Sequence, residues 1–156
     1  MKSILRTAMA LAVFAAGAFC ADNTLGTWKL NPDNSKPPVG QSRITSLIVV
    51  REASGDGVKV TATGEREDKS KIDVSYTAKY DGREVTVSGS GLPYDTIAIK
   101  QVDANTLTDV RSKNGGKYKG TGRFAVSKDG KTATLAPKGT AQDGRPFAGT
   151  TAYDKQ

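Results

Sequence analysis

Apolar and polar residues alternate along most of the chain after residue 25, with the period of two that is typical of β-strands. Asp-Gly or Asn-Gly pairs interrupt this alternation and predict tight hairpin turns, because both central residues of a type I′ turn need a positive φ. No window shows the spacing of an amphipathic helix. The pairs lie at residues 56–57, 81–82, 114–115, 129–130 and 143–144. The strands predicted between the turns are 26–31, 43–52, 57–65, 70–80, 83–88, 95–102, 106–113, 116–127, 131–137 and 145–154.

About ten short strands without a long crossover predict an all-β fold, an antiparallel up-and-down meander. Closing the meander into a barrel leaves no strand edge exposed, so we expect one barrel domain over residues 21–156. Inward positions carry mostly small side chains, which predicts a cavity inside the barrel. A flattened barrel or a two-sheet sandwich is the alternative that would close this cavity.

Two turns predict which side chains face each other across a hairpin. The pairs expected around residues 81–82 and 129–130 are Ala78 with Val85, Tyr76 with Val87, Val126 with Ala133, and Phe124 with Leu135. At 56–57 and 143–144 a three-residue loop is equally compatible with the sequence. One residue of slip would exchange the two faces, so these registers stay open.

Residues 1–20 have the pattern of an export signal, predicted as a helix. Lys2 and Arg6 precede an apolar stretch that is too short to cross a bilayer. Small residues at Ala18 and Cys20 predict cleavage after Cys20 or one residue later, which gives a periplasmic or secreted protein with no transmembrane span. The alternative is a lipoprotein signal in which Cys20 is acylated and retained, although Phe19 stands where a small residue is usual.

The composition argues against catalysis. The chain has no histidine and one cysteine, Cys20, which excludes Ser-His-Asp and Cys-His nucleophiles and His- or Cys-ligated metals from the mature domain. Glu65, Glu67 and Asp68 fall in a charged turn that is typical of a solvated surface. We therefore expect a protein that is no enzyme and holds neither a metal nor a cofactor.

The net charge is +7, of which Lys2 and Arg6 contribute two, so +5 remains after cleavage. A basic surface favours anionic partners such as an anionic envelope surface, and Lys117, Lys119 and Arg123 form a row on one strand. Plain solubility is the alternative reading of this charge. Nucleic acid is not expected as a partner, because no stacking aromatic residues are interleaved with the basic ones.

The opening strand LGTWKL at 25–30 resembles that of the calycin superfamily, the lipocalins and the fatty-acid-binding proteins. Over nearly the whole mature chain, the sequence also resembles small exported bacterial proteins that share a GTWKLN-type pattern. The matching strings are GTWKLN at 26–31, DGVKVT at 56–61, YTAKYDG at 76–82, VSKDGKT at 126–132 and YDKQ at 153–156. This resemblance implies a calycin-like barrel and no particular activity.

Calycin barrels close one end with the tryptophan of the opening strand, and a basic side chain from the end of the chain lies across its indole. The resemblance therefore assigns structural roles to Gly26, Trp28 and Lys155. It does not extend to a helical lid, because the connection 31–42 is short and contains three prolines. In the family's Arg-x-Tyr carboxylate clamp, the tyrosine corresponds to Tyr153, while a threonine replaces the arginine.

The hairpin 106–127 departs most from simple patterning. A two-residue loop at 114–115 or 115–116 turns Asp109 and Arg111 inward, beside two glycines that leave space. A buried charge is costly unless it is paired, hydrated or bound by a ligand. One hypothesis is that Arg111, with Tyr118 and Tyr153, binds an anionic or polar head group next to Asp109. The alternative is that Asp109 and Arg111 neutralise each other near a wet barrel mouth.

These observations favour an exported monomer that binds a small apolar or amphipathic ligand, with an anionic ligand as one option, without catalysis. Two alternatives belong to other classes of protein. One is a protein-interaction module, such as an inhibitor of an envelope hydrolase that uses the connection 31–42. The other is a structural or stress protein of the envelope with no dedicated ligand.

Overall fold

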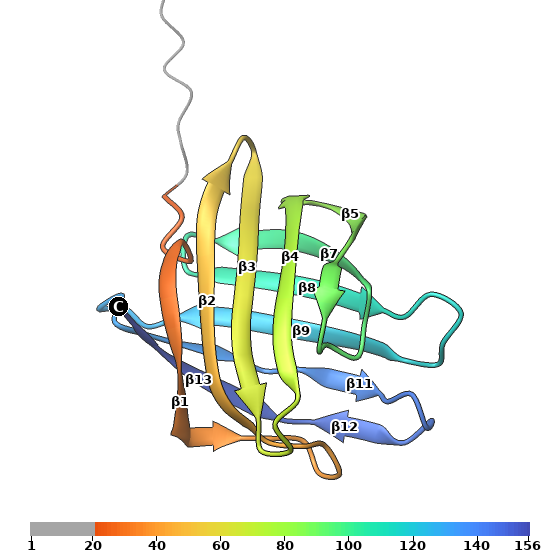
Figure 1. The fold of residues 1–156 in the computed structure, drawn as a ribbon. Helices are drawn as coiled ribbons and strands as arrows, with labels where there is room; N and C mark the ends of the chain where they lie inside the picture. The colour runs from red at the N-terminus through yellow and green to blue at the C-terminus, as the bar shows by residue number, and fades with distance from the viewer. Residues whose placement is uncertain (1–20) are drawn as a thin grey trace, which may run out of the picture.

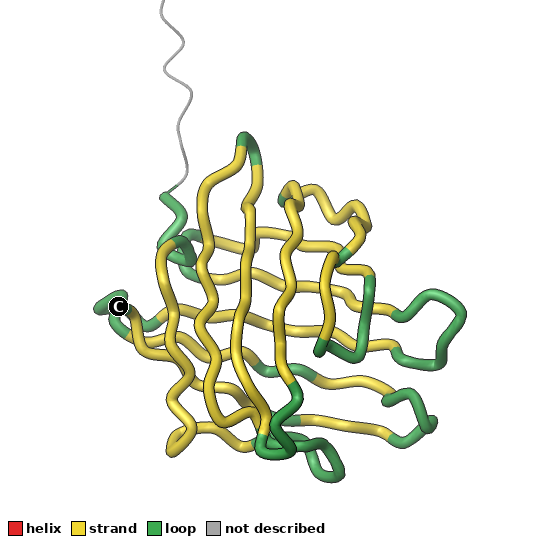
Figure 2. The backbone as a smooth tube through the Cα atoms, in the orientation of Figure 1, coloured by secondary structure: helices red, strands yellow, loops and turns green. Residues whose placement is uncertain are grey.

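The computed structural model describes residues 21–156, and it contains strands and loops but no helix within that range (Figures 1 and 2). The signal helix and the fate of Cys20 lie outside the described residues. The first seven strands are β1 (Gly26–Lys36), β2 (Ile44–Ser54), β3 (Gly57–Arg66), β4 (Lys71–Lys79), β5 (Asp81–Thr86), β6 (Ser88–Ser90) and β7 (Thr96–Asp103). The others are β8 (Thr106–Ser112), β9 (Lys119–Val126), β10 (Thr132–Leu135), β11 (Lys138–Thr140), β12 (Pro146–Ala148) and β13 (Thr150–Lys155).

All pairings are antiparallel, and the sheet curls into a nearly closed barrel (Figure 1). The order of hydrogen-bonded strands is β5-β7-β8-β9-β10-β13-β1-β2-β3-β4-β6, while β11 pairs with β9 and β12. The first and last strands lie side by side, so the two ends of the domain meet in the middle of the sheet. The predicted all-β antiparallel architecture is confirmed.

The hairpin expected at residues 81–82 is met only in part: the pairing of Ala78 with Val85 is wrong, whereas β6 pairs with β4 in the register expected for Tyr76 and Val87. Strand β5 turns away from β4 and pairs with β7, setting Val85 opposite Ile97. The chain returns to β4 as β6, where Ser88 lies opposite Ser75. Strands β5 and β6 are therefore the two ends of the sheet, and the chain joins them covalently through Val87, whose N–H donates to Asp95 O at 2.8 Å.

Thirteen strands replace the ten expected, because two predicted segments are each divided in two and β11 is an additional strand in residues expected to form a loop. The segment 83–88 divides at Val87, as described. Strands β10 and β11 keep one register against β9 and are separated at residues 136–137, where Pro137 has no N–H to donate. Strands β12 and β13 are likewise separated by Gly149.

Strand β1 runs five residues beyond its predicted end, through Pro32. Its pairing with β13 is interrupted after Asn31 and resumes at Lys36. Ser35 bridges the interruption, because its hydroxyl accepts a hydrogen bond from Ala152 N at 2.9 Å and donates one to Asn31 O at 2.7 Å. The side chain thus supplies contacts that the irregular backbone does not make.

The other registers agree in part with expectation. The pairs of Val126 with Ala133 and Phe124 with Leu135 are confirmed. The turn expected as a two-residue loop at 114–115 or 115–116 is longer, since Lys113 N donates to Tyr118 O. Both open registers are now defined: the β2–β3 loop has two residues, 55–56, and the β11–β12 loop has three, 142–144.

The core lies inside the barrel and follows the alternation of the strands. It is built from aliphatic side chains together with Trp28, Phe124 and Tyr153. The ring of Phe124 meets the edge of Trp28 with centroids 5.6 Å apart, while Tyr153 is 6.1 Å from Phe124. Two arginines, Arg51 and Arg111, are also buried.

Candidate functional site

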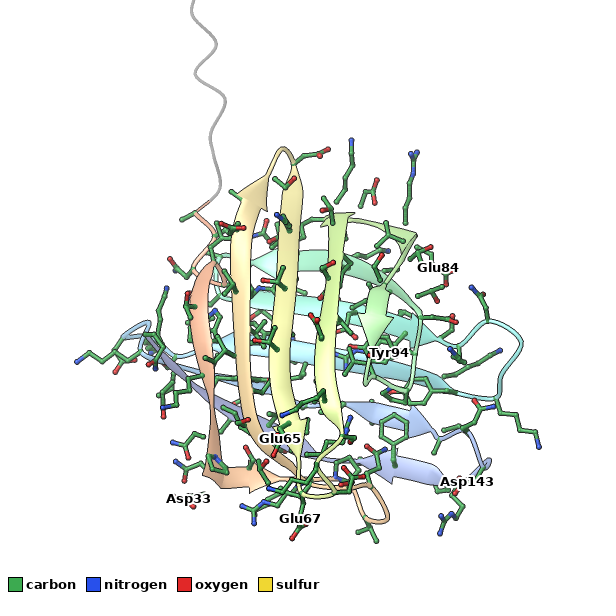
Figure 3. The ribbon with its side chains drawn as sticks, in the orientation of Figure 1. Asp33, Glu65, Glu67, Glu84, Tyr94 and Asp143 are labelled. Carbon is green, nitrogen blue, oxygen red and sulfur yellow. The ribbon has the colours of Figure 1, made fainter. Side chains whose placement is uncertain are left out.

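The barrel encloses a cavity of about 170 Å³. Aliphatic side chains of β2, β3, β4 and β7 line much of its wall. The aromatic lining residues come from several elements: Tyr76 on β4, Tyr94 in the loop after β6, Tyr118 just before β9, Phe124 on β9, Phe147 on β12 and Tyr153 on β13. Residues 37–43 and the loop 91–95 border it at one end, and Tyr94 lies among the inward side chains (Figure 3). The alternative of a collapsed interior is not what the structure shows.

Asp109 and Arg111 form a bidentate ion pair inside the barrel. The Nε of Arg111 donates to Oδ1 of Asp109 at 2.5 Å, and Nη2 donates to Oδ2 at 2.8 Å. Their side chains are only 10% and 9% exposed. The space expected beside Gly122 is therefore occupied by the pair itself, because a Cβ there would lie 2.6 Å from Asp109 Oδ2 and 2.7 Å from Arg111 Nη2. The space beside Gly120 is occupied by Phe147 and Tyr118.

Aromatic rings surround the Arg111 guanidinium. Its Cζ lies 5.1 Å from the centroid of the Tyr94 ring, a cation–π distance. Tyr118 stacks between Tyr94 and Phe147, at 5.9 Å and 5.4 Å. Burial lowers the pKa of Arg111, but Tyr94 and Asp109 raise it by more, so the guanidinium stays charged.

Tyr153 reaches the same cavity from β13, and burial raises its pKa to about 12. The structure thus brings all four candidate site residues, Asp109, Arg111, Tyr118 and Tyr153, to one cavity. Thr151 lines it as well.

Sequence reasoning missed a second buried arginine, Arg51 on β2, which is 7% exposed and lines the cavity. Its Cζ lies 5.1 Å from the centroid of Phe124. Among the described residues, neither Nε nor Nη2 of Arg51 has a hydrogen-bond partner. The signal was present in the alternation, because Arg51 shares a face with Leu47 and Val49, and only the open register of the β2–β3 hairpin concealed it.

The end of the barrel near Trp28 is filled with protein atoms. Lys155 lies opposite Trp28 in the pairing of β1 with β13, and its Nζ is 5.1 Å from the ring centroid. Gly26, with φ +119°, leaves room for the Lys155 stem, because a Cβ there would lie 2.8 Å from Lys155 Cε. On the other side, Trp28 Nε1 donates to the carbonyl of the fully buried Thr24 at 2.9 Å.

The acidic turn lies outside the cavity. Glu65 pairs with Lys69 and Lys71, and hydrogen bonding to Lys71 is the main cause that lowers its pKa. Glu67 lies near the same rim of the barrel (Figure 3). Within residues 21–156, no group of three or more acidic, histidine or cysteine side chains is placed to hold a metal ion.

The basic row Lys117, Lys119 and Arg123 is exposed on the outer face of the barrel. Its role at an anionic envelope surface stays a prediction. In the described part of the chain, no helix has the length and apolar character needed to cross a membrane. No protein-family model matches the chain, and no curated protein matches it either.

Proposed function

We propose that this protein is an exported, calycin-like barrel that binds a small amphipathic ligand in its interior without catalysis. The observation that carries the proposal is the cavity of about 170 Å³, with apolar walls and a few inward polar groups. Concave, mostly apolar sites with few polar groups are the usual form of small-molecule sites.

The volume limits the size of the ligand. An apolar cavity of about 150 Å³ accommodates benzene, whereas drug-sized ligands occupy sites of about 300 Å³ or more. The cavity therefore suits a compact molecule of about ten non-hydrogen atoms. A long-chain fatty acid would extend through the mouth or require the barrel to widen.

The polar groups of the cavity favour binding over chemistry. Asp109 is the one carboxylate among the lining residues, and Arg111 holds both of its oxygens. A carboxylate held in this way is a poor general base, because its charge is stabilised by the guanidinium. The tyrosines of the cavity supply polar hydroxyls on otherwise apolar rings.

Native mass spectrometry of the mature protein, purified gently from its own envelope fraction, tests the proposal. We expect a bound molecule of low mass that is lost in a denaturing run of the same sample. A ligand-free mass, together with no shift in melting temperature across a library of small amphipathic compounds, would contradict it. The denatured mass also reports whether Cys20 was removed or acylated.

A further inference from the structure

The charges that line the cavity do not balance. The lining contains three arginines, Arg51, Arg66 and Arg111, and one acidic residue, Asp109. Asp109 neutralises Arg111 through two hydrogen bonds. An excess of positive charge in a largely apolar interior favours an anionic ligand.

Arg51 differs from the other two arginines in its hydrogen bonds. Arg66 lies at the mouth, where its two terminal nitrogens donate to Ser42 O at 3.0 Å and Gly91 O at 2.9 Å. In Arg51, Nε and Nη2 are both buried and have no partner within residues 21–156. A buried donor without a partner costs free energy, and a charged one costs more.

The two unpartnered donors lie on one edge of the planar guanidinium. Asp109 uses the same edge of Arg111, accepting hydrogen bonds from Nε and Nη2. Two parallel N–H donors match the two oxygens of a carboxylate, which is the usual bidentate geometry. Arg51 lines the cavity beside Phe124, with its Cζ over the ring at 5.1 Å from the centroid.

We propose that the ligand is a small carboxylic acid with an apolar body, and that its carboxylate binds Nε and Nη2 of Arg51. This inference rests on the proposed function and adds the ligand class and the anchoring residue. It differs from the sequence-based hypothesis, in which Arg111 holds the head group, because Asp109 already engages Nε and Nη2 of Arg111.

Arg51 also defines the orientation of the ligand. Its guanidinium lies on Phe124, which packs against Trp28 at the filled end of the barrel. Tyr118 is six residues before Phe124 on the same face of the β-hairpin, about 20 Å away for an extended strand. The carboxylate therefore binds deep in the barrel, and the apolar body points toward the aromatic rings near the mouth.

Calorimetric titration with a matched pair of probes, 3-phenylpropionate and its neutral amide, tests this inference. We expect the acid to bind the unmodified protein about tenfold more tightly or better, the advantage of hydrogen bonds to a charged partner. Arg51→Met should abolish this preference for the acid. Arg123→Met, which removes an exposed arginine from the outer face, should retain it.

Two further measurements distinguish a ligand-binding role of Arg51 from a purely structural one. Arg51→Met should leave the melting temperature of the ligand-free protein unchanged or higher, because it removes a buried charge without a partner. Arg51→Lys keeps the charge but loses the planar donor pair, so its preference for the acid should be intermediate. A large loss of stability in both variants would overturn the assignment.

The outcomes distinguish the two proposals. Equal affinity for the acid and the amide would overturn the inference about Arg51 while the binding function stands. Preference for the acid that survives Arg51→Met would also overturn it. If neither probe binds and the native mass is ligand-free, both the inference and the proposed function fail.

Discussion

At the scale of single residues, the ion pair inside the barrel depends on a glycine. Gly122 lies opposite Asp109 in the pairing of β8 with β9, and Gly120 lies opposite Arg111. Asp109 and Arg111 both extend across the position where a side chain of residue 122 would otherwise be. Strand propensity alone counts glycine in β9 as unfavourable. Here the absence of a side chain at Gly122 is what leaves space for the ion pair.

We predict that Gly122→Ala destabilises the protein by about 2 kcal/mol, because the new methyl group would force the ion pair apart. The φ of Gly122 is not positive, so the cost is steric rather than conformational. Urea denaturation measures the free energy of unfolding. Thr121→Ala, an exposed change on the same strand, should shift it by less than about 0.5 kcal/mol. Equal effects for the two variants would contradict this account of the glycine.

Stability should fall in alkaline solution, because buried tyrosines must ionise. Burial raises the pKa of Tyr153 to about 12, whereas a tyrosine in the unfolded chain ionises near 10. Between these values the unfolded state binds fewer protons than the folded state. The contribution of Tyr153 is therefore complete below pH 10 and is lost as the pH rises to about 12.

Tyr153→Phe should reduce this alkaline loss by up to about 3 kcal/mol, since one pKa unit corresponds to about 1.4 kcal/mol. The free energy of unfolding at pH 8, 10 and 11.5, measured with urea for both proteins, checks the prediction. Parallel pH profiles for the two proteins would show that Tyr153 does not titrate on unfolding.

The sequence predicted whether a side chain faces into the barrel where a tight hairpin defined the register of its strand. Asp109 and Arg111 could be predicted to face inward because another turn independently placed Phe124, on the partner strand, inside the barrel. Arg51 could not be placed in this way, because the loop at residues 55–56 allowed two registers and therefore two faces. A difference of one residue in a turn thus concealed the charge on which the ligand class now depends.

At the scale of elements, two loops at the mouth are tied together by one side chain. Arg66, at the end of β3, donates to Ser42 O in the connection after β1 and to Gly91 O in the loop after β6. Both segments border the cavity. Any ligand that enters from this end must pass loops that Arg66 holds in place.

We predict that Arg66→Met loosens these two loops while the barrel stays folded. Amide hydrogen exchange in residues 39–42 and 91–95 should become about tenfold faster, since hydrogen bonds from a charged donor contribute about 1.5 kcal/mol or more. Mass spectrometry of peptides from exchanged samples measures this. Arg43→Met is the matched control, because the one hydrogen bond that the Arg43 side chain donates within residues 21–156 goes to Pro32 O. Similar exchange in both variants would exclude the role assigned to Arg66.

Predictions of elements succeeded where backbone hydrogen bonding is continuous and failed where it is interrupted. Proline and glycine explain two of the interruptions, at Pro137 between β10 and β11 and at Gly149 between β12 and β13. The departure of β5 from β4 has a different cause, because the register of β6 with β4 is the one that the hairpin predicted. Closing the barrel requires one segment to pair with β7, and no local pattern in residues 81–86 reveals this.

At the scale of the whole molecule, the strands form one continuous ladder from β5 to β6 around a single core. The ladder includes β1 between β13 and β2, so the two ends of the domain are paired in the native state. Such non-local pairing predicts slow folding, in the range of milliseconds to seconds. It also means that neither end of the barrel forms a core of its own.

We therefore predict that the barrel unfolds in one cooperative transition. Trp28, the single tryptophan, reports by fluorescence on the filled end, while near-ultraviolet circular dichroism also includes the stacked rings of Tyr94 and Tyr118 at the mouth. The two probes should give the same urea midpoint.

Lys155→Met removes the cation next to Trp28 but keeps an apolar stem, and it should lower stability by about 1 kcal/mol. Because the core is shared, this change at one end should move both midpoints equally, and a shift in the Trp28 signal alone would show that the two ends unfold independently.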